Sequence, residues 1–208
     1  MLLQSPYNIF NLINSAVNLN TLYLTVPKGY QIIENDINNI NLEFIYLQNI
    51  NTINNNIFSG LNNLYDIYLY GDYDYIPSNA FFIKNPNIIN NLTIWIGNSQ
   101  INGSSFGSDV FTNPNRTLQI HFIRNYNLQT LKESIFGELF HKDPRNLILF
   151  IDNPLNCSDC DFKWIFDRKS ELISQIIYAK CSDGRDFYNM TINDFNHCST
   201  NNGMLYKS

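Results

Sequence analysis

A short step of one apolar, one aromatic and one apolar residue recurs along the first three quarters of the chain. The six copies are Leu22–Leu24, Ile45–Leu47, Ile67–Leu69, Ile94–Ile96, Ile120–Phe122 and Leu149–Ile151. Alternation with a period of two is typical of a β-strand, because successive side chains point to opposite faces. Each copy is therefore predicted to be a strand with buried flanking residues and an outward central residue.

The copies recur at intervals of roughly 22 to 29 residues, a spacing typical of repeat proteins. A strand this short cannot bury its face alone, so the copies must stack on one another to form a continuous core. Four strands are followed by a second apolar step, Ile57–Phe58, Ala80–Phe81, Val110–Phe111 and Ile135–Phe136. Between strand and Phe lie further core candidates, Ile50, Ile53, Ile76, Ile101, Phe106, Leu128 and Leu131. The pattern predicts a stack of coils, each with a strand on one side and a Phe on the other.

Asparagine follows several of the strands. Asn49, Asn98 and Asn153 stand two places after their strands, and Asn125 stands three places after. Asparagine turns a chain readily, because its short amide tolerates unusual dihedral angles and bonds to nearby backbone. The alternative interpretation is that Asn is simply abundant everywhere in this chain.

The central residues of the six strands form a candidate ligand-binding surface. They are Tyr23, Tyr46, Tyr68, Trp95, His121 and Phe150, and the flanking outward positions add Phe44, Tyr70, Asp66, Thr93, Gln119, Ile123, Ile148 and Asp152. An exposed apolar stripe of this size favours association, and Tyr and Trp are common interface anchors. The alternative is that the rings only stabilise the sheet through cross-strand pairs. We expect this face to bind a protein or a glycan.

Composition limits the classes of function. With 208 residues, of which 44% are hydrophobic, the chain can bury the core of one elongated domain. The net charge of -5 and the 15% of charged residues exclude the basic surface that nucleic acid requires. No apolar run approaches the ~20 residues of a membrane helix, so no membrane span is expected in this chain.

Four cysteines, Cys157, Cys160, Cys181 and Cys198, all lie in the last quarter of the chain. An even, clustered set favours disulfides. Zinc is the alternative, but one C-x-x-C followed by lone cysteines at unrelated spacings is a poor ligand pattern. Disulfides indicate an oxidising, extracellular route.

N-glycosylation sequons agree with that route. We expect glycans at Asn91, Asn102, Asn115 and Asn189, whereas Asn156, beside Cys157, is a poorer acceptor. The segment Met1–Pro6 has neither a basic nor a long apolar region, so it does not resemble a signal peptide. We expect the chain to be a fragment of a longer secreted precursor, and the alternative is that it starts in an unusual way.

The sequence from Asn153, N-P-L-N-C-S-D-C-D-F-K-W, resembles the cysteine-rich C-terminal cap of secreted leucine-rich-repeat proteins. The matching positions are Asn153, Pro154, Cys157, Trp164, Cys181, Phe195 and Cys198, with one extra residue between the first two cysteines. Residues Ile76 to Phe81 likewise resemble the L-P-x-x-x-F stretch of extracellular repeats. The resemblance implies that Cys157 pairs with Cys181, that Cys160 pairs with Cys198, and that Trp164 closes the repeat core.

The fold class implied is α/β, a leucine-rich-repeat solenoid or horseshoe with a parallel sheet on its concave face and an irregular or short helical convex side. Residues 1–18 are expected to be an N-terminal segment, truncated or an incomplete first coil, and residues 19–152 about six repeats. Residues 153–198 form the cap and residues 199–208 a flexible tail. Apolar spacing predicts two short cap helices, one around Phe162, Ile165 and Phe166 and one around Leu172, Ile173, Ile176 and Ile177.

No catalytic site is predicted. The three histidines, His121, His141 and His197, lie far apart without a motif, and the cysteines are accounted for by the cap. Asp72 and Asp74 are two carboxylates without a full calcium ligand set. We therefore expect no metal, no cofactor and no enzymatic activity.

Within the superfamily, the Cys-Asp-Φ-x-Trp and Cys-x-x-Gly steps look most like arthropod secreted proteins named after the non-catalytic subunit of Oplophorus-luciferin 2-monooxygenase. The resemblance implies a second possibility for function. In it, the chain is a supporting subunit of an oxygenase-like complex and stabilises a catalytic partner. A non-enzymatic extracellular recognition module remains the first expectation.

Overall fold

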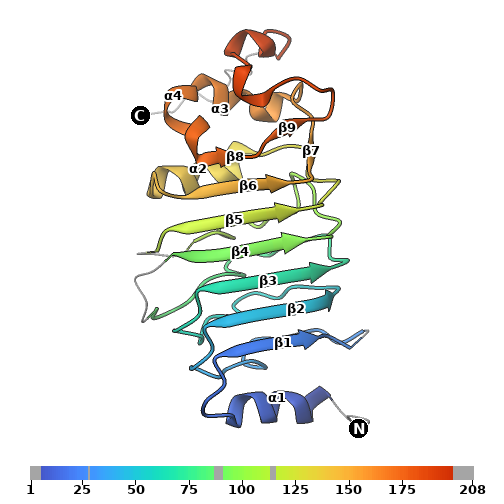
Figure 1. Ribbon diagram of the computed structural model, residues 1–208, viewed down its shortest axis with the longest axis vertical. Helices are drawn as coiled ribbons and strands as arrows, with labels where there is room; N and C mark the ends of the chain where they lie inside the picture. Colours follow the sequence, from blue (N-terminus) through green and yellow to red (C-terminus); the bar gives the residue numbers. More distant parts are fainter. Residues whose placement is uncertain (1–5, 28, 87–90, 113–115, 199–208) are drawn as a thin grey trace, which may run out of the picture.

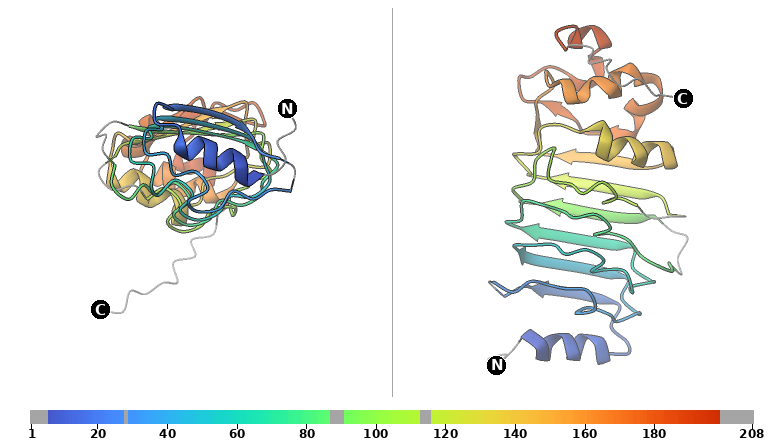
Figure 2. Two further views of the ribbon diagram at one scale, coloured as in Figure 1. Left: turned by 90° about the horizontal axis from the view of Figure 1, so that it is seen from below. Right: turned by 180° about the vertical axis from the view of Figure 1, so that it is seen from behind.

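The computed structural model describes residues 6–27, 29–86, 91–112 and 116–198 and has a mixed α/β architecture. Its main feature is a seven-stranded parallel sheet in which strands follow one another in chain order (Figure 1). The strands are β1 (Thr21–Thr25), β2 (Phe44–Ile50), β3 (Asp66–Gly71), β4 (Leu92–Gly97), β5 (Leu118–Ile123), β6 (Leu147–Ile151) and β8 (Ile176–Ile177). After each strand the chain returns behind the sheet, as the view from behind shows (Figure 2). One strand with its return segment is called a coil below.

The core lies between the sheet and the return segments. In β1 to β5 the flanking residues of each apolar–aromatic–apolar step are buried, as predicted. Behind the sheet, Phe58, Phe81, Phe111 and Phe136 form a column with ring centroids 6.2, 5.9 and 5.6 Å apart. Phe136 belongs to helix α2 (Glu133–Lys142), which lies behind β6 in Figure 1. The predicted second apolar steps are therefore confirmed as core.

A residue at or just after the end of several strands has a left-handed backbone. Positive φ angles of 69°, 53°, 54°, 56° and 59° occur at Asn49, Asn98, Arg124, Asp152 and Tyr178, respectively. Asparagine tolerates this region better than most residues, whereas a bulky side chain rarely adopts it. The turning role predicted for Asn49 and Asn98 is confirmed.

Asn125 and Asn153 have the second predicted role and bond to backbone inside the core. Asn125 Nδ2 donates to the Ile96 carbonyl at 2.8 Å, and its Oδ1 accepts from the Ser99 amide at 3.1 Å. Asn153 Nδ2 donates to the Phe122 carbonyl at 2.6 Å, and its Oδ1 accepts from the Asn125 amide at 2.8 Å. These amides join three neighbouring coils on the inside.

Strand β6 buries the face that was expected to point outward. Leu149, not Phe150, pairs with His121, and Phe150 pairs with Phe122. Phe150 is only 2% exposed and stacks on Phe122 at 5.7 Å, while Ile148 is fully buried. The prediction that Phe150 and Ile148 point outward is therefore wrong.

The reason is that Leu147–Ile151 is apolar at every position, so its alternation does not identify the buried face. A shift of one residue exchanges the two faces of a strand. The register is set by Asn146, whose Oδ1 accepts from the Leu118 amide at 2.7 Å, and by Asn153. With this register Asn153 stands three places after the last inward residue of its strand, as Asn125 does.

Helix α1 (Pro6–Ser15) lies across the β1 end of the stack (Figure 1), where an incomplete first coil was expected. Proline suits its first turn, because the missing N–H has no intrahelical partner there. Phe10 and Ile13 enter the core, and Asn39 Nδ2 donates to the Ile13 carbonyl at 2.7 Å. The helix thus covers apolar surface that β1 and its return segment leave at this end.

The cap is built from short elements at the other end of the stack. They are β7 (Pro154–Leu155) and β9 (Lys180–Cys181), the helices α3 (Lys163–Asp167) and α4 (Lys169–Leu172), and the 3-10 helices η1 (Cys160–Phe162), η2 (Ile173–Gln175), η3 (Phe187–Asn189) and η4 (Ile192–Phe195). Disulfides join Cys157 to Cys181 and Cys160 to Cys198, the pairing that the resemblance implies. Trp164 is buried against the return segment that follows β5, where it contacts Phe140 and donates from Nε1 to the Leu131 carbonyl at 2.9 Å.

The second cap helix is shorter than predicted. Helical structure ends with η2 at Gln175, and Ile176–Ile177 forms β8, which extends the sheet beside β6. The same apolar residues satisfy a helix pattern and a strand pattern, so spacing alone does not separate the two. None of the described helices has the length and apolar character that a membrane span requires. The predicted flexible tail, 199–208, lies outside the described residues.

Candidate functional site

A column of rings runs along the open face of the sheet. Tyr23, Tyr46, Tyr68, Trp95 and His121 are paired in that order across β1 to β5. Paired residues of parallel strands place their side chains next to one another on one face. Successive ring centroids lie 5.7, 6.0, 5.0 and 3.7 Å apart.

Two further rings widen the column. Phe44 contacts Tyr23 at 5.2 Å and Tyr68 at 5.0 Å, and Tyr70 stacks on Tyr46 at 5.5 Å. The six rings Tyr23, Phe44, Tyr46, Tyr68, Tyr70 and Trp95 are called the aromatic face below. Tyr23 is 69% exposed and the other five are half-buried, so part of every ring is open to solvent.

Gly97 makes room for one of these rings. It pairs with Tyr70, and a Cβ atom at Gly97 would collide with the Tyr70 ring. The missing side chain lets the phenol lie flat over the neighbouring strand. Desolvation raises the pKa of both Tyr68 and Tyr70 above the ordinary value of 10, which already keeps a phenol neutral and able to donate a hydrogen bond at physiological pH.

One carboxylate lies beside the aromatic face. Asp66 is the only acidic side chain among the outward positions of β1 to β5, which hold no Lys or Arg. Desolvation raises its pKa, while Trp95 and Thr93 act in the opposite direction. The indole Nε1 of Trp95 lies close enough to affect this carboxylate without the geometry of a formed hydrogen bond. The face is therefore apolar with a weak negative character.

His121, the last ring of the column, is buried. It is 8% exposed, and neither ring nitrogen has a hydrogen-bond partner among the described residues. Desolvation lowers its pKa to about 4, so the imidazole is neutral at physiological pH. Sequence reasoning placed His121 in the correct column but did not foresee its burial between Trp95 and β6.

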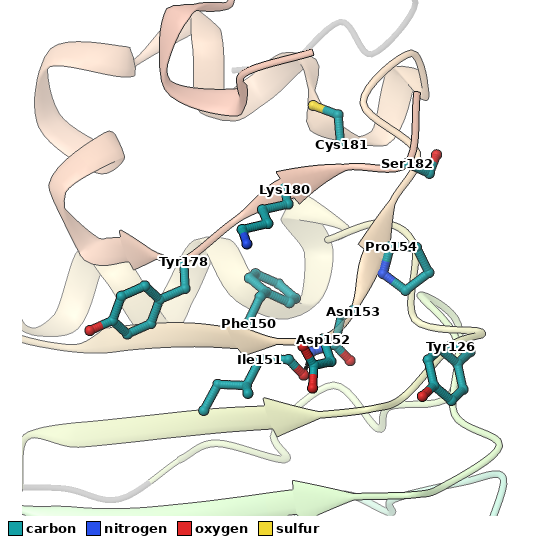
Figure 3. Close-up of a pocket in the computed structure, with 10 residues that line it drawn as sticks. All are labelled: Tyr126, Phe150, Ile151, Asp152, Asn153, Pro154, Tyr178, Lys180, Cys181 and Ser182. Carbon is teal, nitrogen blue, oxygen red and sulfur yellow. Dashed lines mark hydrogen bonds between the residues drawn. The ribbon is translucent and has the colours of Figure 1, made fainter. Parts of the chain in front are cut away.

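The structure thus brings together seven of the eight predicted surface residues, five in the central column together with Phe44 and Tyr70. Phe150 is separated from them because it faces the core. Its ring instead lines a cavity between β6 and the cap (Figure 3). Tyr178 and Lys180, which also line this cavity, had no sequence signal, because their positions depend on where β8 leaves the sheet.

Groups with other chemistry are few in the described part of the chain. Among the described residues, one group of three side chains could hold a metal ion. It consists of Cys160, His197 and Cys198, whose ligand atoms lie within 4.8 Å of one another. The two sulfurs of this group form a disulfide, so they are not available as thiolate ligands. Asp72 and Asp74, the candidates considered for calcium, are exposed and form no group of three acidic, His or Cys ligands.

The predicted glycosylation sites are accessible where they are described. Asn91, Asn102 and Asn189 are exposed, and Asn156 is exposed too. The side chain of Asn189 donates to Asp186 at 2.9 Å. Asn115 lies outside the described residues.

Comparison of the chain with models of protein families and with curated protein sequences finds no match. Function is therefore inferred from the geometry of the aromatic face and of the cap.

Proposed function

We propose that this chain is a non-enzymatic extracellular recognition module that binds a protein or a glycan through the aromatic face. One observation carries the proposal: six rings in mutual contact lie on an open face of the sheet, with part of each ring exposed. Core packing does not require these rings, because the opposite side of the same strands already fills the interior. Open apolar surface of this kind is stabilised when a ligand covers it.

The electrostatics of the aromatic face narrow the class of ligand. Asp66 is the one acidic side chain on the outward positions of β1 to β5, and no Lys or Arg stands on those positions. A sulfated or phosphorylated polyanion would meet little free counter-charge there, because Arg124, a cation that acts on the pKa of Tyr70, is already bonded to Asp152. A neutral glycan satisfies the surface through ring stacking and hydrogen bonds to phenol and indole, and a protein does so with apolar or cationic side chains.

The cap supports an extracellular setting. Two disulfides are stable in oxidising compartments and rare in reducing ones. We propose secretion and glycan attachment at the exposed sequons as parts of the same assignment. We also propose that the coils are leucine-rich repeats of a horseshoe-shaped solenoid. The buried asparagines after β5 and β6 and the pairing of the cap cysteines support that family.

Binding is tested with two probes, a printed array of neutral and charged glycans and an array of purified extracellular protein domains. The triple variant Tyr46→Ser, Tyr68→Ser, Trp95→Ser removes the middle of the aromatic face. A matched control, Ile33→Ser, Ile40→Ser, Tyr75→Ser, removes three exposed apolar side chains elsewhere. We expect the first variant to lose at least tenfold in affinity for the ligand and the control to bind as wild type, with both folded by circular dichroism.

Equal binding by the face variant and wild type would overturn the proposal. Copurification distinguishes the alternative function. A stable, stoichiometric catalytic partner on the purified chain would favour the supporting subunit that the resemblance implies.

A further inference from the structure

The last strand of the sheet, β8, separates from β6 before β6 ends. β8 pairs with β6 only at Ile148 with Ile176 and at Leu149 with Ile177. At Tyr178 the backbone turns with a φ of 59°, and the chain then pairs as β9 with β7. β6 continues through two more residues without this partner, so the sheet is open between its carboxyl end and the 178–180 segment.

A cavity of about 590 Å³ occupies this opening. It is called the cap cavity below. The rings of Phe150, Tyr126 and Tyr178 and the side chains of Ile151 and Pro154 supply its apolar lining (Figure 3). The cavity volume is within the range of small-molecule sites, which are concave and mostly apolar.

Bonds within the protein already fix the walls of the cap cavity. The Cys157–Cys181 disulfide and the bond from the Ser182 amide to the Leu155 carbonyl, 2.8 Å, fix β9 against β7. On the segment that leads into β9, the Ala179 amide donates to the Tyr188 hydroxyl at 3.0 Å. A site whose walls are already fixed requires little ordering when a ligand binds.

Two charged side chains line the cap cavity, and only one of them has a partner among the described residues. Asp152, on the rim, is bonded to Arg124 at 3.4 Å. The side chain of Lys180 makes no hydrogen bond or ion pair with any residue that the structure describes, and Figure 3 shows it directed toward the Phe150 ring. The cavity therefore combines an apolar floor with one unpaired ammonium group.

We propose that the cap cavity binds a small organic anion with an apolar body, which packs against Ile151 and Tyr178 while its carboxylate or sulfonate meets the Lys180 ammonium. An anionic head group pairs with the free positive charge, and the ring or chain covers the apolar floor. This site is separate from the aromatic face, and its existence does not depend on the ligand proposed there.

A matched pair of fluorescent probes tests the charge. Anilinonaphthalene sulfonate is an apolar ring system with an anionic group, and N-phenylnaphthylamine has the same rings without the charge. We expect one molecule of the sulfonate to bind per chain. Lys180→Gln should weaken the sulfonate about tenfold and leave the neutral probe unchanged, whereas Tyr178→Ser should weaken both. The control Lys84→Gln removes an exposed ammonium elsewhere and should change neither affinity.

A second comparison locates the probe. Because apolar dyes also bind open aromatic surfaces, the variant Tyr46→Ser, Tyr68→Ser, Trp95→Ser is measured beside the cavity variants. Sulfonate binding that survives this variant and is lost in Lys180→Gln supports the cap cavity. Loss in the aromatic-face variant, or equal loss in Lys84→Gln and Lys180→Gln, overturns it. Displacement of the bound sulfonate by competing anions then distinguishes two classes of ligand. Dodecanoate represents a fatty acid with an acyl chain, and naphthoate represents an aromatic acid. Failure of both to displace the dye also contradicts the proposal.

Discussion

The indole of Trp95 stacks on the imidazole of His121, with ring centroids 3.7 Å apart and planes inclined by 28°. This is the shortest ring contact along the column and the point where the open face becomes buried. Both imidazole nitrogens are enclosed without a partner among the described residues. The ring therefore acts as a neutral packing group that joins the aromatic face to β6.

The burial of His121 predicts a pH dependence of stability. Its pKa is lowered from the ordinary value of 6.5 to about 4, so between these values the unfolded chain binds more protons than the folded one. The free energy of unfolding should then fall as the pH falls from 6.5 to 4, by at most about 1.4 kcal/mol per pH unit, and solvent screening reduces that slope. Above pH 6.5 the contribution is fully present.

Urea unfolding of wild type and His121→Phe across this pH range isolates the effect. The phenyl ring keeps the stacking and does not titrate, and all carboxylates are common to the two proteins. We expect the wild type to lose more stability toward acid than the variant. Parallel curves would show that His121 is not the source.

The register of β6 is tested by comparing two neighbouring residues. Phe150→Ala removes a buried ring that stacks on Phe122 and should lower the free energy of unfolding by about 3 to 5 kcal/mol. Leu149→Ala removes a half-buried side chain and should lower it by about 1 kcal/mol, because less apolar surface is lost. The reverse order, measured by urea unfolding, would support the register in which Phe150 points outward.

Because the side-chain amide of Asn125 is buried and hydrogen-bonded, its replacement by an apolar side chain of similar size should lower the stability markedly. Asn125→Leu leaves the Ile96 carbonyl and the Ser99 amide without their partner, and each unsatisfied group costs about 1 to 3 kcal/mol. Asn127→Leu is the matched control, because the Asn127 side chain is exposed and, among the described residues, bonds only to Gln100. Thermal unfolding should show a marked fall in Tm for the first variant and a small change for the second.

Each disulfide is expected to stabilise the chain through its loop. The sequence separations are 24 and 38 residues, which correspond to about 3 to 4 kcal/mol per bond on the chain-entropy model. The paired variants Cys157→Ala with Cys181→Ala and Cys160→Ala with Cys198→Ala remove one bond at a time. Urea unfolding and peptide mapping under non-reducing conditions provide the measurements, and a cross-paired Cys157–Cys160 peptide in wild type would contradict the structure.

The inward residues of β1 to β5 were predictable, because apolar and aromatic positions alternate there and only one face can be buried. The ladder of rings from Tyr23 to His121 follows from the same alternation once parallel strands are stacked in register. The disulfide pairing was predicted from the resemblance of the cap to a known family, because cysteine spacing alone does not determine which cysteines pair. Within the cap, local pattern failed at Ile176–Ile177, where two apolar residues suit a helix or a strand equally well.

The sequence by itself determined that strands recur, that they stack, and which residues of an alternating strand share a side. The tertiary structure decided three features that depend on partners distant in the chain: the buried face of β6, the enclosure of His121, and the opening of the sheet at Tyr178. The physical reason is that periodicity records only the relative orientation of neighbouring side chains. The face that becomes interior, and the point at which a strand leaves its neighbour, are set by backbone pairing and by buried amides such as Asn146 and Asn153.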